Sequence, residues 1–182
     1  MRPGEYVLYF ALQPPVEAQR EVRRRLAEAK ARWPLTARPV PPERLHVSLC
    51  GVGAFPSLPH EVVTAARCAG AAARDRPFRV AFNRLGAWGR GEGPRPLVLW
   101  GDEGVIGVES LHQRLHAALA ALGLAGGAPG PIWPHMTLLR DRTAVPETVV
   151  PKVDWWVREF VLIASLHGAG RHEVLGRFPL VA

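Results

Sequence analysis

Short apolar segments alternate along this chain with longer segments of helical periodicity, and prolines or glycines separate most of them. The first apolar segment, residues 6–12, is followed by Pro14-Pro15 and by an Arg/Glu/Ala-rich stretch that stops at Trp33-Pro34. Proline favours the first turn of a helix and ends a helix that precedes it. The pattern therefore predicts a strand and then a helix that runs to about residue 32.

The rest of the chain continues this mixture of strands and helices. We expect further strands at residues 44–52, 78–88, 96–100, 132–140, 160–166 and 171–180, and further helices at residues 57–73 and 105–122. Residues 89–94 are rich in glycine and lie between two predicted strands, which is typical of a hairpin loop. The Gly-Arg-Gly-Glu-Gly run is not a phosphate-binding loop, because the helix and the lysine of such a loop do not follow it. Strands separated by helices in each half predict an α+β chain of two similar lobes.

The length and composition indicate one folded domain over residues 1–182. A chain of this size buries roughly 70% of its unfolded surface. The 48% hydrophobic and 21% charged content is ordinary for a globular protein, and no apolar run is long enough for a membrane span or a signal peptide. Two isolated cysteines give little support for a disulfide framework or a zinc site. We therefore expect a cytoplasmic protein that neither contacts a membrane nor needs a structural metal.

The net charge is +7, and arginine carries almost all of the positive charge because Lys30 and Lys152 are the only lysines. The planar guanidinium group binds phosphate with two hydrogen bonds and stacks on bases. This composition favours RNA or nucleotides as partners. A bias in base composition explains it equally well, since the chain is also rich in Ala, Pro and Gly.

Two tetrads share the pattern His-apolar-hydroxyl-apolar. They are residues 46–49 (His-Val-Ser-Leu) and residues 135–138 (His-Met-Thr-Leu), one in each half of the chain. Both fall in predicted strands, where positions i and i+2 point to the same face. Each histidine therefore shares a face with its hydroxyl, while the two apolar residues anchor the opposite face in the core.

These groups suit the cleavage of a phosphodiester. One group must take a proton from the attacking oxygen and another must protonate the leaving oxygen, and an imidazole with a pKa of about 6.5 does either. Ser48 and Thr137 are expected to hydrogen-bond the non-bridging phosphate oxygens, and Arg140 is expected to add a charged clamp. The motifs predict His46 and His135 as the acid–base pair.

The chain resembles the 2H phosphoesterases, and among them the bacterial and archaeal RNA 2′,3′-cyclic phosphodiesterases, also called the 2′-5′ RNA ligase group. The resemblance spans nearly the whole chain. It is carried by residues 9–11 (Tyr-Phe-Ala), 43–46 (Glu-Arg-Leu-His), 133–140 (Trp-Pro-His-Met-Thr-Leu-Leu-Arg), 165–166 (Ser-Leu) and 178–180 (Phe-Pro-Leu). Two places depart from the group: Ser48 stands where threonine is usual, and residues 50–53 (Cys-Gly-Val-Gly) replace an aromatic-leucine-glycine run.

The resemblance implies a fold of two pseudo-symmetric lobes of antiparallel sheet, with outer helices, around a central cleft. It implies catalytic roles for His46 and His135 and substrate contacts from Ser48, Thr137 and Arg140. Phe10 is a further candidate contact, because its strand is expected to border the cleft. The implied reaction is hydrolysis of RNA 2′,3′-cyclic phosphate termini to 2′-phosphates by a monomer, without metal or cofactor. Its partners are RNA 3′ ends or nucleotides with a cyclic phosphate.

Three other functions fit the same residues. Ligation of RNA ends through a 2′-5′ bond would be the reverse reaction. A 2H phosphodiesterase acting on a small cyclic nucleotide, such as a cyclic phosphate of ADP-ribose, would need the same pair of imidazoles. A non-catalytic RNA- or nucleotide-binding module would keep the fold and the positive charge, but binding alone would not require both tetrads to be intact.

Other histidines and the tryptophans have ordinary structural interpretations. Glu109, His112 and His116 are spaced to hold a metal on one helix, but this pattern is more typical of an outer helix face. The remaining histidines lack a partner hydroxyl and are expected in turns or on the surface: His60, His167 and His172. Five tryptophans are expected mainly as packing residues, although each is able to stack on a base: Trp88, Trp100, Trp133, Trp155 and Trp156.

Overall fold

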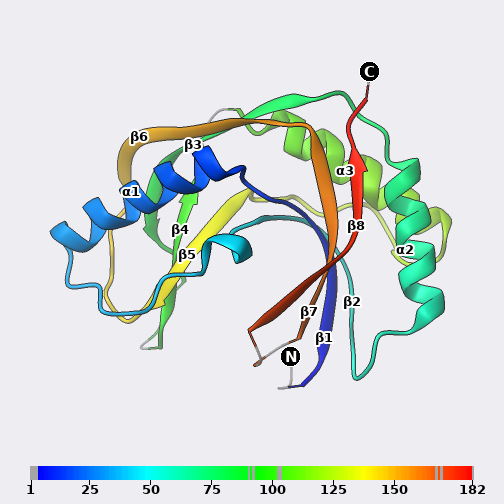
Figure 1. Ribbon diagram of the computed structural model, residues 1–182, viewed down its shortest axis with the longest axis horizontal. Coiled ribbons are helices and arrows are strands. Elements are labelled where there is room, and N and C mark those ends of the chain that lie inside the picture. Colours follow the sequence, from blue (N-terminus) through cyan, green and yellow to red (C-terminus); the bar gives the residue numbers. More distant parts are fainter. Residues whose placement is uncertain are drawn as a thin grey trace.

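The computed structural model describes residues 4–89, 91, 93–101, 104–166, 168 and 170–181. Eight antiparallel strands form one sheet in the order β6-β3-β4-β5-β2-β1-β7-β8 (Figure 1). The strands are β1 (Tyr6–Leu12), β2 (Val47–Phe55), β3 (Phe78–Ala87), β4 (Arg95–Trp100), β5 (His135–Asp141), β6 (Thr148–Val157), β7 (Glu159–Leu166) and β8 (Arg171–Pro179). The helices are α1 (Val16–Arg32), α2 (His60–Ala72) and α3 (Ile106–Ala121), with a short 3-10 helix η1 (Pro42–Arg44). The predicted α+β class is confirmed.

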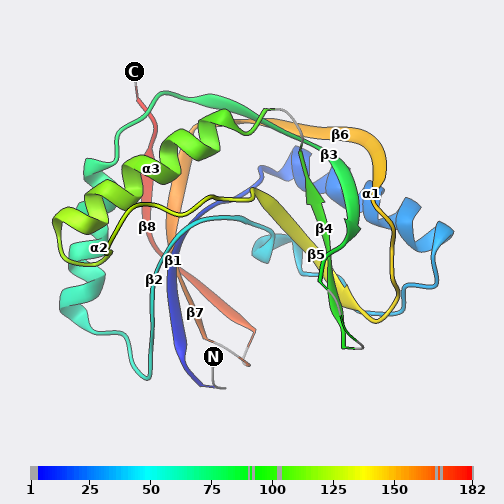
Figure 2. The same ribbon diagram turned by 180° about the vertical axis from the view of Figure 1, so that it is seen from behind.

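The sheet is built from two four-stranded lobes that meet where β2 pairs with β5. Outward from this junction, β2, β1, β7 and β8 of one lobe correspond to β5, β4, β3 and β6 of the other. The units β1-α1-β2 and β4-α3-β5 are both strand-helix-strand connections, and each helix crosses to the opposite lobe, α1 contacting β6 and α3 contacting β2. Figure 2 shows α2 and α3 beside the lobe of β1, β2 and β8, with α1 at the far side of the molecule.

The lobes do not correspond to the two halves of the chain, contrary to the sequence interpretation. One lobe takes β1 and β2 from the beginning of the chain and β7 and β8 from its end, whereas β3 to β6 form the other lobe. The physical reason is that strand pairing joins segments far apart in sequence, and periodicity reports only the local element type. Each tetrad still lies in a different lobe, because β2 and β5 are the two strands at the junction.

The alternation of side chains along β1 shows how the sheet separates the core from the opposite face. Leu8, Phe10 and Leu12 are fully buried in the main core cluster, which also includes residues of α1 and α3. Tyr9 and Ala11 point the other way, where Ala11 belongs to a second, smaller cluster with residues of β7. One face of this lobe is therefore anchored under helices, and the other is available to a site.

Most predicted elements are present, with a few differences at their ends and one strand that was not expected. The second strand begins at Val47 instead of residue 44, because Pro42–Arg44 forms η1. Strand β6 was missed, since Pro151 argues against a strand interior; β6 is an edge strand, where a missing N–H is tolerated. The hairpin of β3 and β4 is confirmed, although Arg90 and Glu92 of its loop, like His167, lie outside the described residues.

The helices are short or carry many charges. Among the described residues, none is both long and apolar enough to cross a membrane.

Candidate active site

The two tetrads lie side by side at the junction of the lobes. Strands β2 and β5 are antiparallel, and Val47 pairs with Met136. Both of these side chains are fully buried in the core. In an antiparallel pair the neighbours of opposed residues are themselves opposed, so His46 lies beside Thr137 and Ser48 lies beside His135. All four point away from the core, and we call the surface that they form the histidine face.

The two imidazoles are held in the same way. The Nδ1–H of His46 donates to the backbone carbonyl of Arg44 at 2.7 Å, and the Nδ1–H of His135 donates to that of Trp133, also at 2.7 Å. A carbonyl oxygen only accepts hydrogen bonds, so Nδ1 carries the proton in both rings. The other ring nitrogen, Nε2, is consequently left as the one that accepts or donates a proton at the histidine face.

The two histidines differ in their surroundings. Burial lowers the pKa of His46 from the ordinary value of 6.5, while its bond to the Arg44 carbonyl raises it, and the positive charges of His135 and Arg44 lower it further. A positive charge on the His135 ring is thus close enough to disfavour protonation of His46. A pair in which one ring is neutral and the other charged is the form that acid–base chemistry requires.

A β-bulge brings Arg140 to the same face as His135 and Thr137. Residues 135 and 140 differ by an odd number and would point to opposite faces of a regular strand. Against β4, however, the register shifts so that Leu138 is an extra residue, and both Leu138 and Leu139 are buried. Arg140 is exposed as a result, and the bulge places the guanidinium on the histidine face.

The first tetrad carries a bulge at the equivalent position. Against β1, the register of β2 shifts so that Leu49, directly after Ser48, is the extra residue. The residue that corresponds to Arg140 is then Gly51, which is exposed, and a Cβ added to it would have no heavy atom within 4 Å beyond its chain neighbours. The histidine face therefore has an exposed arginine in one lobe and open space at the matching position of the other.

Two residues next to His46 were not identified from the sequence. The rings of Tyr9 and His172 lie 5.3 and 5.6 Å from the His46 ring, centroid to centroid. Burial raises the pKa of Tyr9 to about 12, so its phenol remains protonated. Burial, followed by the charges of Arg44 and His46, lowers the pKa of His172 to about 4. The only sequence signal was alternation, which puts Tyr9 opposite to the core residue Phe10.

The expectation that Phe10 contacts substrate is not supported. Its side chain is fully buried, and its ring packs against Phe160 and Phe178 at 5.9 Å from each. The strand does border the histidine face, but Phe10 points to the opposite side of the sheet. Tyr9, one position earlier, occupies the place that was proposed for Phe10.

Three tryptophans gather next to His135. The Trp88 ring lies 4.7 Å from the His135 ring and 5.4 Å from the Trp100 ring. Together with Trp133, which is 73% exposed, they line a cavity of about 790 Å³ that also includes Ile132. An exposed aromatic surface of this kind is suited to stacking a nucleobase. The packing interpretation holds for Trp155, which is buried against Phe82.

The possible metal group on α3 is not supported. The Nδ1 and Nε2 atoms of His112 lie 2.8 and 3.2 Å from the backbone carbonyls of Leu49 and Gly130. Within the described part of the chain, no three His, Cys, Asp or Glu side chains are arranged to hold a metal ion. His112 instead connects α3 to the bulge that follows Ser48.

Asp141 is a further buried residue that the sequence patterns did not indicate. Its carboxylate accepts hydrogen bonds from the backbone N–H groups of Thr36, Ala37 and Thr143 at 2.8–2.9 Å. These bonds hold the pKa of the carboxyl group well below its usual range. Asp141 thereby connects the end of β5, next to Arg140, to the loop that follows α1.

Comparisons with known proteins agree with this geometry. The E. coli LigT structure in apo form matches with a TM-score of 0.77 and 26% identity, over 98% of this chain and 99% of that one. TT0787 of Thermus thermophilus matches with a TM-score of 0.75 and 27% identity, over 96% and 97%. E. coli LigT complexed with 3′-AMP also matches, with a TM-score of 0.75, 27% identity and coverage of 98% and 99%.

The sequence comparisons point to the same group. A search of curated proteins gave no match. The profile of the 2′-5′ RNA ligase superfamily matches residues 14–169, which include both tetrads and most of the strands of both lobes. The chain therefore belongs to the 2′-5′ RNA ligase superfamily of 2H phosphoesterases.

Proposed function

We propose that this protein hydrolyses 2′,3′-cyclic phosphates at RNA ends to 2′-phosphates by acid–base catalysis with His46 and His135. The observation that carries the proposal is the pairing of Val47 with Met136, which sets the two histidines and two hydroxyls on one face. A module that only binds RNA has no need for two imidazoles held with Nε2 directed outward.

The reaction follows from the arrangement of these groups. A water molecule attacks the phosphorus, and Nε2 of one histidine accepts its proton. The bond from phosphorus to O3′ breaks, and Nε2–H of the other histidine donates a proton to O3′. The products are a 3′-hydroxyl and a 2′-phosphate, and the pair is left with its two protonation states exchanged.

The hydroxyls and Arg140 stabilise the charge on the phosphoryl oxygens. Ser48 and Thr137 each lie beside the histidine of the opposite strand, so they are able to donate to the non-bridging oxygens. The Arg140 guanidinium adds a charged donor on the same face. Positioned donors of this kind perform the task that a metal performs in other phosphodiesterases, and we propose that this enzyme needs none.

A nucleotide substrate is supported by the aromatic cavity beside His135. Trp88 and Trp133 provide ring surfaces for a base next to the reacting phosphate. The related E. coli LigT was crystallised with 3′-AMP, which has both a base and a phosphate on the ribose. We propose that the terminal base lies on this aromatic surface.

Ligation through a 2′-5′ bond is a second candidate. Equivalent hydrogen bonds to the backbone hold the two imidazoles, so each histidine is able to act as the acid in one direction of the reaction and as the base in the other. In ligation the 5′-hydroxyl of another RNA end takes the place of water: it attacks the phosphorus, the bond from phosphorus to O3′ breaks, and a 2′-5′ linkage with a free 3′-hydroxyl results. In the reverse reaction this 3′-hydroxyl attacks the 2′-5′ linkage, and the 5′-hydroxyl leaves as the cyclic phosphate forms again. The name of the superfamily favours this activity as an additional one.

The decisive assay is incubation with an RNA oligonucleotide that ends in a 2′,3′-cyclic phosphate, in the presence of EDTA. We expect conversion to a 2′-phosphate end. Changing either His46 or His135 to alanine should lower kcat by roughly 10²–10⁴-fold or more, because each removes one proton transfer. Unchanged substrate, or full activity in either variant, would refute the proposal, and activity lost on chelation would refute its metal independence.

A further inference from the structure

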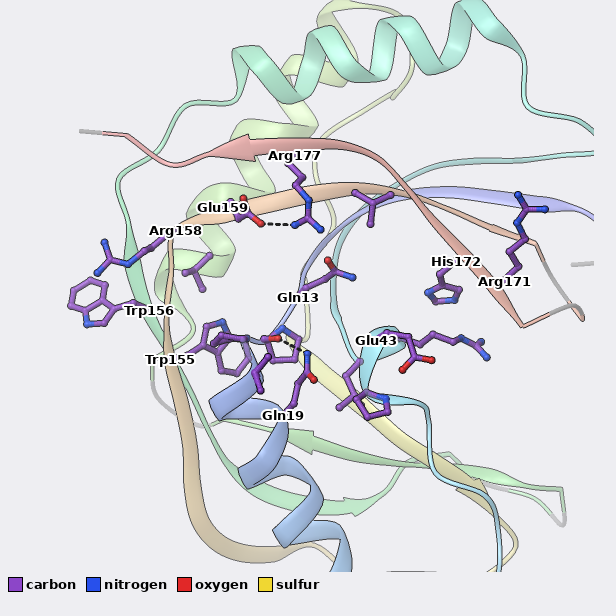
Figure 3. Close-up of a pocket in the computed structure, with 18 of the residues that line it drawn as sticks. Gln13, Gln19, Glu43, Trp155, Trp156, Arg158, Glu159, Arg171, His172 and Arg177 are labelled. Carbon is purple, nitrogen blue, oxygen red and sulfur yellow. Dashed lines mark hydrogen bonds and ion pairs between the residues drawn. The ribbon is translucent and has the colours of Figure 1, made fainter.

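A second cavity, of about 810 Å³, is lined in part by His172, whose ring lies 5.6 Å from the His46 ring. Figure 3 shows Glu43, Arg171 and His172 at one end of it and Trp155, Trp156 and Arg158 at the other. We call it the arginine groove, because its lining includes four arginines: Arg44, Arg158, Arg171 and Arg177. The glutamates in its lining are Glu43 and Glu159. The groove therefore has an excess of positive charge.

Two polar atoms at the His172 end of the groove have no hydrogen-bond partner. They are Nε of Arg44 and Nδ1 of His172, both buried, and neither is satisfied by any described residue. A third atom of this kind, Nε of Arg25, belongs to a guanidinium whose other nitrogens contact Glu21 and Glu28. Unpaired buried polar atoms are rare in proteins and call for an explanation. Because protein covers these two atoms, a ligand in the groove would contact the other nitrogens of the same two side chains.

The unsatisfied atoms adjoin the catalytic pair. The His172 ring is 5.6 Å from the His46 ring, and the Arg44 carbonyl accepts the Nδ1–H of His46. A substrate whose cyclic phosphate reaches His46 would thus have its next phosphate, one nucleotide upstream, near Arg44 and His172. A phosphodiester oxygen is an acceptor that matches a guanidinium N–H and an imidazole N–H.

We propose that the arginine groove binds the RNA chain upstream of the terminal nucleotide, with Arg44 and His172 holding the phosphodiester nearest to the reacting group. The inference rests on the proposed function and narrows its substrate to an oligonucleotide. Arg177 pairs with Glu159 at 2.6 Å and Arg171 pairs with Glu173 at 3.6 Å, so the positive excess of the groove lies on Arg44 and Arg158. The amides of Gln13 and Gln19 between the two ends provide further polar contacts.

The test compares two substrates in the wild type and in the Arg44→Gln variant. One is a nucleoside 2′,3′-cyclic phosphate with a 5′-hydroxyl, and the other is an RNA trinucleotide ending in the same cyclic phosphate. We expect kcat/KM of the wild type to be roughly 10-fold or more higher for the trinucleotide, the effect of a charge-assisted hydrogen bond. Arg44→Gln should remove most of this preference, and Arg44→Lys should retain part of it.

The matched control is Arg76→Gln, which removes an exposed arginine that does not line the groove. It should keep the wild-type preference. A wild type without preference, or an Arg44→Gln variant that loses the same factor on both substrates, would overturn the inference and leave the cyclic phosphodiesterase intact. A thermal melt of each variant checks that it is folded.

If neither substrate is hydrolysed, a binding measurement still tests whether the arginine groove binds RNA. Fluorescence anisotropy of a 5′-labelled trinucleotide with a terminal 2′-phosphate reports affinity without turnover. Weaker binding by Arg44→Gln than by Arg76→Gln would support the groove although the proposed function had failed. Equal affinities of the two variants would overturn it.

Discussion

The orientation of His46 and of His135 depends in each case on a backbone atom two residues earlier in the chain. The carbonyls of Arg44 and Trp133 accept the Nδ1–H bonds, so side-chain substitutions at these two positions leave the bonds available. For this reason Arg44→Gln tests the guanidinium alone. The same arrangement in both lobes makes Nε2 of each ring the nitrogen that the proposed reaction uses.

At the residue scale, Arg140 provides the sharpest test of the phosphate contacts. We expect Arg140→Gln to lower kcat/KM for the cyclic phosphate roughly 10- to 100-fold, because a charged donor to the phosphoryl oxygens is lost. The matched control is Arg142→Gln, two residues later and also exposed, beyond the end of β5. Steady-state kinetics of the two variants tests this prediction. Similar losses of kcat/KM in both would show that overall positive charge matters and that the position of Arg140 does not.

The histidines near the site also predict how stability depends on pH. The pKa of His172 is about 4 and that of His46 is below 6.5, whereas both approach 6.5 in the unfolded chain. Between about pH 6.5 and 4 the unfolded chain therefore binds more protons than the folded one, so the free energy of unfolding should fall as the pH falls. Urea unfolding at pH 7.5 and pH 5 measures this decrease.

His172→Phe keeps a ring beside Tyr9 and His46 but removes one titrating group. It should reduce the decrease in stability between the two pH values. A stability that is the same at both pH values in the wild type, or a decrease that the substitution leaves unaltered, would show that these histidines do not have the depressed pKa values.

At the element scale, the bulges in β2 and β5 determine which side chains share the histidine face. Each follows the hydroxyl of its tetrad, and the carbonyl of each bulged residue has a partner: His112 donates to Leu49, and the Val40 N–H donates to Leu138. A bulge without such a bond would be free to revert to regular pairing. Helix α3 and the segment after α1 therefore hold the bulges in place.

This arrangement predicts a positioning role for His112. His112→Ala removes the bond to Leu49, and we expect the free energy of unfolding to fall by about 1–3 kcal/mol, since a buried carbonyl loses its partner. We also expect kcat to fall, because Ser48 is adjacent to the released bulge, while KM changes less. His116→Ala on the same helix is the control. Equal behaviour of the two variants in urea unfolding and kinetics would exclude this role.

The type of each element was easier to predict from the sequence than its exact ends or the position of a strand in the sheet. The apolar run of β1 and the helical period of α3 are local signals, and both elements appear where expected. Strand β6 was missed because Pro151 is unfavourable in a paired strand, and only the sheet order shows that β6 lies at an edge. The start of β2 shifted because a proline formed a 3-10 turn instead of extended chain.

At the scale of the whole molecule, the two lobes place different chemistry on either side of the histidine pair. The lobe of β5 brings the aromatic cavity with Trp88 and Trp133, and the lobe of β2 brings Arg44 and His172. The two histidines thus have unlike neighbours, with His172 beside His46 and Trp88 beside His135. On the proposed function, this difference gives the RNA one direction across the site, with its terminal base on the tryptophans.

The sequence by itself determined the features that depend on near neighbours. His46 and Ser48, like His135 and Thr137, share a face because alternation operates over two residues, and the apolar residues between them are buried as the pattern requires. Together with the other segments that resemble the superfamily along the chain, these motifs indicated the family and predicted the acid–base pair. The shared face within each tetrad followed from the local period alone.

The tertiary structure alone decided which distant residues meet. His172 comes to His46 because β8 pairs with β7, and β7 pairs with β1 beside β2, across more than a hundred residues of chain. Phe10 turns to the core and Tyr9 to the site because the Phe10 side of β1 packs in one cluster with residues of α1 and α3, a fact that alternation cannot supply. Burial and register are properties of the packed molecule, whereas a sequence pattern reports periodicity without saying which face will be covered.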